Sequence, residues 1–292
     1  MASLKEVKDK IESVKKTKQI TRAMNMVASA KLRKAQARIE RFRPYAEKFY
    51  DILGDLSAGM ETAAHPLLER RDQVNNVGIL LITSERGLCG AFNANLIDKG
   101  FNLAEEKRKN GQTPQFFCAG KKGRDAVRKS RYELAKGRVG IMDGFDFTLA
   151  NELGSDLIFA YEQGELDEVH LVYGRFMSVV RQEPTALQIL PVAPEAGAEQ
   201  ESRGPGAEYT YEPSPEGILN ELLPRFIKVQ VYRGLLETSA SEHAARMTAM
   251  DNAQRNCDDM ISNLTLTYNK ARQAAITSEL LDIVGGAEAL KG

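Results

Sequence analysis

The residues whose types could most readily take part in a reaction lie in a short loop, Ser84–Gly90. Within it, Cys89 stands beside glycine residues, as a nucleophilic thiol often does. Such a thiol needs a base that removes its proton. The sequence offers three histidines, His65, His170 and His243, and the sequence places none of them to serve Cys89. We therefore interpret Cys89 as structural or interfacial, and the three histidines as structural.

The same loop follows an apolar run and precedes a helix-like stretch, which invites a nucleotide-binding interpretation. It lacks the GxGxxG spacing that lets a backbone approach a pyrophosphate. No GxxxxGK[ST] sequence occurs in the chain, and Gly120-Lys121-Lys122-Gly123 is too short for one. HExxH, GxSxG and paired-carboxylate motifs are also missing. We expect no active site and no cofactor.

The cysteines also argue against a metal site. Cys89, Cys118 and Cys257 are far apart in the chain and form no CxxC pair. With three histidines in all, a zinc site is not expected, and reduced thiols are the simplest interpretation.

The first 60 residues predict one long helix that carries a heptad-like apolar stripe. The stripe has two parts, separated by the polar residues Lys18 and Thr21, and Pro44 is a candidate kink. About 55 helical residues are roughly 80 Å long, so the helix must project beyond any core of its own chain. The stripe residues are Leu4, Val7, Ile11 and Val14, then Met24, Ala28, Leu32, Ala35, Ile39, Phe42, Ala46, Phe49, Leu53 and Leu56.

The last part, residues 213–288, predicts a second long helix. Its stripe alternates in steps of four and three residues from Leu236 to Ser278, through Ala240, His243, Met247, Met250, Gln254, Cys257, Ile261, Leu264, Tyr268, Ala271 and Ala275. We place Pro224 in its first turn and its end at Gly285-Gly286. Two such helices at opposite ends of one chain favour an antiparallel coiled coil, a shaft, over two homodimeric coils.

Residues 74–212 predict a central α/β domain, small and Rossmann-like, with a largely parallel sheet. The run Val77–Thr83 is typical of a strand buried on both faces. Residues 193–217, rich in Pro, Gly and Glu, predict a linker or mobile loop. The other predicted strands are Gln115–Cys118, Glu168–Met177 and Thr185–Pro191, and the helices are Asn93–Asn110, Lys121–Lys129 and Phe147–Glu162.

Charge and hydropathy are distributed unevenly. Residues 1–48 contain 14 basic and 5 acidic residues, a net charge of +9, and residues 165–223 carry a net charge of −8. A basic helix suggests an acidic partner surface, although most charge runs are only solvated. From Ala274 to Leu290 apolar residues surround the helix, which predicts a protein sleeve around this end.

The N-terminal residues lack the apolar core of a secretory signal, and no run approaches a membrane span. We therefore expect a protein of the cytoplasm. Overall composition, with 42% apolar and 27% charged residues, excludes collagen-like, disordered and disulfide-scaffold classes.

Three motifs resemble the γ subunits of F-type ATP synthases, over essentially the whole chain and in the family's order. The first runs from Ile11 to Ala28 and contains Ser13-Val14-Lys15, Gln19-Ile20-Thr21 and Ala23-Met24. The second is Ser84-x-Arg86-Gly87-Leu88-Cys89-Gly90. The third, and most specific, is Arg272-Gln273-Ala274-x-Ile276-Thr277-x-Glu279-x-x-Asp282-x-x-x-Gly286-Ala287. The cysteine-bearing insert of chloroplast forms is missing.

The resemblance implies a rotating shaft without catalytic groups. Its implied partners are the α and β subunits of the catalytic hexamer, the ε subunit and the membrane c ring, with no nucleic acid. It implies a peripheral location on the cytoplasmic face of the cell membrane, with attachment only through the complex. Contacts with β are implied for Arg272, Gln273, Thr277 and Glu279, for Met24 at the shaft surface near Arg272, and for Arg86 and Cys89 near an acidic lever of β.

Two other classes stay open at this point. Residues 1–48 alone allow a basic coiled-coil protein that binds nucleic acid, with an affinity that falls steeply with salt. The middle of the chain allows a nucleotide-dependent α/β enzyme, although it lacks every phosphate-binding motif.

Overall fold

The computed structural model describes residues 4–58, 65–192 and 215–289. The contacts divide the chain into two compact units: a shaft unit, Met1–Ala28 with Met247–Gly292, and a central unit, Ser29–Arg246. Two long helices, α1 (Leu4–Ala58) and α5 (Pro215–Ala289), contribute to both units. The predicted domain ranges 1–60, 74–212 and 213–288 stay a prediction.

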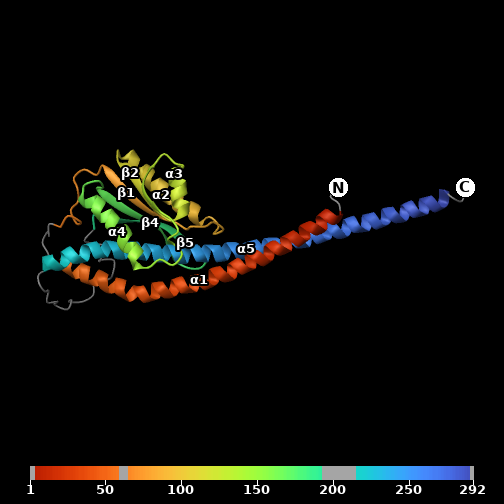
Figure 1. Cartoon of the computed structure of the whole chain (residues 1–292), viewed down its shortest axis with the longest axis horizontal. Helices are drawn as coiled ribbons and strands as arrows, with labels where there is room; N and C mark the ends of the chain where they lie inside the picture. Colours follow the sequence, from red (N-terminus) through yellow and green to blue (C-terminus); the bar gives the residue numbers. More distant parts are fainter. Residues whose placement is uncertain (1–3, 59–64, 193–214, 290–292) are drawn as a thin grey trace. The chain divides into compact units, whose positions relative to one another are not determined.

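The central unit is built on a five-stranded sheet in the order β3-β2-β1-β4-β5 (Figure 1). The strands are β1 (Asn76–Ile82), β2 (Thr113–Ala119), β3 (Glu133–Arg138), β4 (Glu168–Phe176) and β5 (Gln182–Leu190). The first four are parallel, and β5 pairs antiparallel with β4. The prediction of a largely parallel sheet is therefore confirmed.

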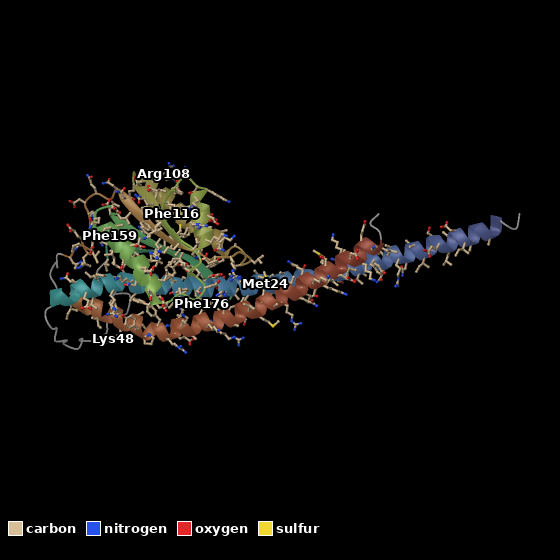
Figure 2. All side chains as sticks on the ribbon, in the orientation of Figure 1. Met24, Lys48, Arg108, Phe116, Phe159 and Phe176 are labelled. Atoms are coloured by element: carbon tan, nitrogen blue, oxygen red, sulfur yellow. The ribbon has the colours of Figure 1, made fainter. Side chains whose placement is uncertain are left out.

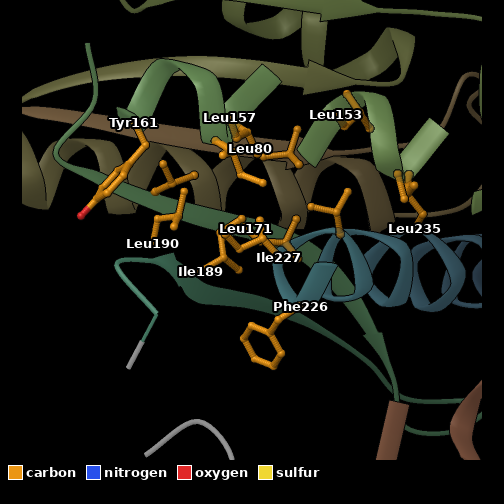
Figure 3. Packing of buried hydrophobic residues seen from close by; sticks show 14 of the residues in the cluster. Leu80, Leu153, Leu157, Tyr161, Leu171, Ile189, Leu190, Phe226, Ile227 and Leu235 are labelled. Atoms are coloured by element: carbon orange, nitrogen blue, oxygen red, sulfur yellow. The ribbon is translucent and has the colours of Figure 1, made fainter. Parts of the chain in front are cut away.

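Helices cover both faces of this sheet. On one face, α2 (Phe92–Lys109) and α3 (Lys121–Arg128) pack over alternate residues of β1, such as Ile79 and Leu81. On the other, α4 (Phe147–Glu162) and α5 pack over Leu80 and Leu171 (Figure 3). Because both faces of β1 are covered, its side chains form the continuous apolar run seen in the sequence.

Both long helices lie antiparallel in each unit, as predicted. In the central unit, Phe49 of α1 stacks on Phe226 of α5, and Phe42 meets Tyr232 edge-on with ring centroids 4.9 Å apart. In the shaft unit, Asn25 Nδ2 donates to the Met247 carbonyl (2.9 Å), and Lys18 forms an ion pair with Asp258. Residue numbers rise on one helix as they fall on the other, which defines the antiparallel register.

The line of contact between α1 and α5 in the shaft unit, here called the seam, is polar where the sequence predicted an interruption of the apolar stripe. Thr21 is buried, and its hydroxyl donates to the Lys18 carbonyl of its own helix (3.0 Å). Lys18 turns to Asp258 of α5. Packing thus continues through this stretch, although the apolar stripe does not.

Several predicted boundaries are wrong. Helix α5 begins at Pro215, so residues 215–217 are helical rather than linker, and Pro224 lies inside the helix rather than in its first turn. Packing of Leu223 and Ile227 into the core stabilises the helix across the missing N–H. The linker residues 193–214 lie outside the described residues.

The glycines at the other end of α5 do not terminate it. The helix runs through Gly285 and Gly286 to Ala289, and neither glycine has the positive φ of a glycine cap. Helix α1 likewise continues through Pro44. Strand β3 was not predicted, because its sequence, ELAKGR, has no β-branched or aromatic residue.

Candidate partner-contact surfaces

The Ser84–Gly90 loop connects β1 to α2 and is held from within by Asn93. The Asn93 amide oxygen accepts from the Ser84 backbone N–H (3.1 Å) and hydroxyl (2.9 Å). Its Nδ2 lies 3.1 Å from Cys89 Sγ. Leu88 adopts a φ of 61°, which is uncommon for a residue with a side chain, and its side chain is exposed. These contacts hold the loop from inside, and they leave Arg86 and Leu88 exposed at its surface.

A carboxylate of the chain itself lies at the start of α3. Glu85 Oε2 accepts from the Lys121 backbone N–H at the start of α3 (3.1 Å). Free amides at a helix start attract anions. Nearby, Thr83 Oγ1 accepts from the Gly123 N–H (2.8 Å), so a second amide is also satisfied. Both amides at the start of α3 are therefore bonded within the chain.

Cys89 is not arranged as a nucleophile. Its side chain is 1% exposed, and burial raises the pKa of the thiol despite the opposing charge of Arg246. A raised pKa lowers the fraction of reactive thiolate. We therefore assign it a structural role inside the loop.

Each of the three histidines has a contact within the chain that is consistent with a structural role. His65 Nδ1 accepts from the Leu67 N–H (3.1 Å), and His170 Nε2 lies 2.8 Å from Glu168 Oε1. His243 is buried beside Arg246, and burial lowers its pKa to about 4. It is therefore neutral at pH 7, beside a charged guanidinium.

The loop is also tied to α5 through Arg246. One guanidinium nitrogen donates to the Gly87 carbonyl (3.2 Å), and the other lies 2.7 Å from Glu242 Oε1. Burial raises the pKa of Glu242, and Arg246 opposes this shift. The arrangement makes the position of residues 84–90 depend on α5.

Arg86 is the exposed charged residue of the loop, with 79% of its side chain accessible. Its Nη2 lies 3.5 Å from Asp143 Oδ2, and the other oxygen of Asp143 accepts from Lys31 Nζ of α1 (2.7 Å). Lys31 holds the pKa of Asp143 below its usual range, against the effect of burial. Sequence reasoning missed Lys31 and Asp143, because Asp143 lies in an irregular segment without a motif.

Four predicted contact residues lie together on the outer end of α5. Arg272, Gln273, Thr277 and Glu279 are all exposed. Spacings of four and seven residues place Gln273 with Thr277, and Arg272 with Glu279, on shared sides of the helix.

Met24 does not join them, which corrects the sequence-based placement. It lies on α1 (Figure 2), and its neighbour Asn25 bonds to Met247. Arg272 is about 25 residues further along α5, or about 38 Å at 1.5 Å per residue. Antiparallel register therefore separates Met24 from Arg272, although both belong to the shaft unit.

The end of α5 exposes large apolar side chains on several sides. Exposed fractions are 48% for Ile276, 57% for Leu280, 67% for Leu281 and for Ile283, and 59% for Val284. Within the described chain, no side chain of residues 276–287 is buried. Such a surface is typical of an interaction site.

Residues 4–58, 65–192 and 215–289 contain neither a metal-binding cluster nor a membrane-spanning helix. No group of three or more His, Cys, Asp or Glu side chains is placed to hold a metal ion. None of the helices there has the length and hydropathy of a membrane span.

Comparison with solved structures shows the same fold. The central stalk and c-ring structure of the Tetrahymena thermophila mitochondrial ATP synthase contains a chain with 27% identity and a TM-score of 0.57, over 80% of this chain and 99% of that one. A chain from the Euglena gracilis mitochondrial ATP synthase matches with a TM-score of 0.65 and 21% identity, over 98% of this chain and 94% of that one.

Sequence comparison identifies the family. The family model described as ATP synthase matches residues 3–290. The ATP synthase gamma chains of Nitratidesulfovibrio vulgaris and Maridesulfovibrio salexigens are 64% and 61% identical, each over the full length of both chains. A central parallel sheet, two long antiparallel helices and this similarity lead to one conclusion: the chain belongs to the ATP synthase gamma chain family.

Proposed function

We propose that the chain works as the central rotor shaft of an F-type ATP synthase. It couples ion flow through the membrane c ring to ATP synthesis or hydrolysis at the β subunits, by rotation inside the α/β hexamer. Its partners are α, β, ε and the c ring. The chain itself is non-catalytic and lies at the cytoplasmic face of the cell membrane, held there by the complex.

The exposed apolar end of α5 is the observation that carries this proposal. A helix with Leu281, Ile283 and Val284 each more than half exposed is unfavourable in water, at about 25 cal/mol for each Å² of apolar surface. A surrounding sleeve of other subunits removes that cost. Few charges lie in this segment, so the sleeve acts as a bearing rather than as a torque contact.

Two polar surfaces supply the torque contacts. The first contains Arg272, Gln273, Thr277 and Glu279, which lie just before the apolar end. An Arg is costly to desolvate without an acceptor, so Arg272 meets a carboxylate or carbonyl of β at particular angles. The second is Arg86, whose guanidinium is exposed and suits the carboxylates of an acidic segment of β. Cys89 supports this loop from inside.

Rotation changes β because the contacts differ with angle. At each angle a given β subunit meets a different side of the shaft, so its open and closed states are stabilised to different extents. A partner shifts a conformational equilibrium by the difference between its affinities for the two states. No catalytic group on this chain is needed for that coupling.

The test uses the chain assembled with the α and β subunits of its own complex. We expect an ATP-hydrolysing assembly in which a bead attached to the central unit rotates in steps. The isolated chain should show no ATP binding in equilibrium dialysis at micromolar nucleotide. Hydrolysis with a stationary bead would refute the rotor role, and micromolar binding by the chain alone would refute its non-catalytic character.

A further inference from the structure

A short segment between β3 and α4, here called the strap (residues 139–146), joins the Ser84–Gly90 loop to α1. At one end, Glu85 Oε1 accepts from the Ile141 N–H (3.1 Å). At the other, Arg38 donates to the Phe145 carbonyl and places its guanidinium carbon 4.5 Å from the Phe145 ring centroid. These contacts hold the strap independently of its one central charged residue, Asp143.

Asp143 is shared unequally between two cations. Its Oδ1 lies 2.7 Å from Lys31 Nζ, whereas its Oδ2 lies 3.5 Å from Arg86 Nη2. Arg86 has 79% of its side chain exposed, compared with 44% for Lys31. A long, exposed ion pair contributes little and exchanges readily with other partners. The Lys31 contact is the tighter of the two.

The exposed side of Arg86 leaves room for a second carboxylate. A guanidinium carries five N–H donors in a planar fork, and the contact with Asp143 uses one edge of it. When Arg86 turns away, Asp143 keeps the charge of Lys31 beside it, so the loss of Arg86 leaves no unpaired carboxylate. Exchange of Arg86 between an internal and an external acceptor is therefore inexpensive in both directions.

We propose that Asp143 is a positioning residue that competes with a carboxylate of β for Arg86. Asp143 holds the guanidinium between contacts, releases it when β presents its acidic segment, and recaptures it as rotation proceeds. Lys31 sets the strength of this competitor, because it draws on the same carboxylate. The inference rests on the proposed contact between Arg86 and β.

The charge of Asp143 then controls how long Arg86 stays on β. Removing it by Asp143→Asn should lengthen the pause at the contact angle by about 1.5- to 5-fold, the range expected for loss of one exposed ion pair. Lys31→Gln should have the opposite effect and shorten that pause, because Asp143 is then free to bind Arg86 more tightly. If both residues only held the strap in place, both substitutions would change the pause in the same direction.

Single-molecule rotation of the assembled complex tests this directly. Pause lengths are compared for the unmodified chain, Asp143→Asn, Lys31→Gln, Arg86→Gln, and each of the first two combined with Arg86→Gln. With Arg86 replaced, neither Asp143→Asn nor Lys31→Gln should change the pause further. Asp156→Asn is the matched control, because Asp156 is likewise shared by two cations of the central unit, Lys136 (2.8 Å) and Arg138 (3.0 Å).

The possible failures are distinguishable. Equal effects of Asp143→Asn with and without Arg86, or the same direction for Lys31→Gln, overturn the competition while leaving the rotor role intact. No effect of Arg86→Gln on any pause overturns the Arg86 contact itself, and the competition with it. Pause changes for Asp156→Asn as large as those for Asp143→Asn would assign the effect to general loss of surface charge.

Discussion

Met24→Lys is the substitution that best distinguishes the effect of one added contact at the shaft surface from a loss of structure in the whole shaft. Met24 is half-buried on α1, at the level of α5 where Asn25 bonds to Met247. The flexible apolar side chain of Met adapts to changing neighbours. We expect a Lys there to add an ammonium that meets carboxylates or carbonyls of β at one rotor angle. We expect continued ATP hydrolysis with fewer ions pumped per ATP.

The size of the effect expected for Met24→Lys follows from one added charged contact. A hydrogen bond to a charged group contributes about 1.5–3 kcal/mol when partly desolvated. At 1.36 kcal/mol per factor of ten, escape from the favoured angle slows by roughly 10- to 160-fold. The effect on Arg272 is negligible by comparison: two charges about 38 Å apart in water interact by about 0.1 kcal/mol before salt screening.

The antiparallel register therefore predicts which second changes interact with Met24→Lys. Arg272→Ala should add to its effect independently, within about 0.5 kcal/mol. Asp251→Asn should worsen it, because Asp251 is the first carboxylate of α5 beyond Met247, and its exposed ion pair with Arg255 (2.6 Å) can exchange for one with the new Lys. Met24→Gln, polar but uncharged, is the control and should pump nearly normally.

Hydrolysis and ion pumping are measured on the same membrane vesicles for each variant. Unchanged pumping per ATP in the Met24→Lys complex would show that this surface does not set coupling. Strong non-additivity with Arg272→Ala would refute the separation of Met24 from Arg272 along the shaft.

Three further predictions concern stability and assembly. Ile261→Asp or Leu264→Asp should loosen the antiparallel helix pair, because each places a charge at a half-buried position between the helices. Cross-linking of introduced cysteine pairs within one chain should then fall. If the protein without these Asp substitutions cross-linked only between chains, the antiparallel pairing would be contradicted. Deletion of residues from Gly286 onward should leave substantial rotation in the assembled complex, whereas complete loss would refute the bearing. Burial alone would raise the pKa of Glu168, but hydrogen bonds from His170 and Lys107 outweigh it and lower the pKa to about 2. Its carboxylate therefore stabilises the fold fully above pH 4.5 and loses this effect as the pH falls to 2. Glu168→Gln should accordingly lower the urea midpoint at pH 7 and have little effect near pH 2; equal losses at both pH values would exclude the linkage.

The elements with strong periodicity could be predicted from the sequence. The stripe on α5 at Met250, Gln254, Cys257 and Ile261 is buried or half-buried, as its spacing indicated. Helix α4 was placed at its observed bounds, and Asp146 explains its start, because its carboxylate accepts from the Thr148 N–H (2.9 Å). Local residue types determine both features, so sequence alone is sufficient for them.

Features that depend on tertiary contacts were predicted poorly. Strand β3 forms because β2 offers a parallel neighbour, and Arg138 at its end pairs with Asp156 of α4. The level of Met24 relative to Arg272 depends on the register between two helices, which a stripe on each helix alone does not define. The strap joins residues more than 50 positions apart, such as Glu85 and Ile141, and no motif marks such a contact.

The shaft unit has much less internal packing than the central unit, and this difference bears on how the rotor works. Among its described residues, five side chains are buried: Val7, Thr21, Ala28, Met250 and Cys257. Thr21 contributes little apolar burial, and Ala28 buries a single methyl group. Because burial of apolar area supplies most of the stability of a helix pair, this pair gains little from its own seam. We therefore expect its stiffness in the assembled complex to come from the surrounding subunits. We expect such a shaft to transmit torque only while the surrounding subunits enclose it. Substitutions between the two helices and loss of contacts with the surrounding subunits should therefore both lower the stiffness of the helix pair.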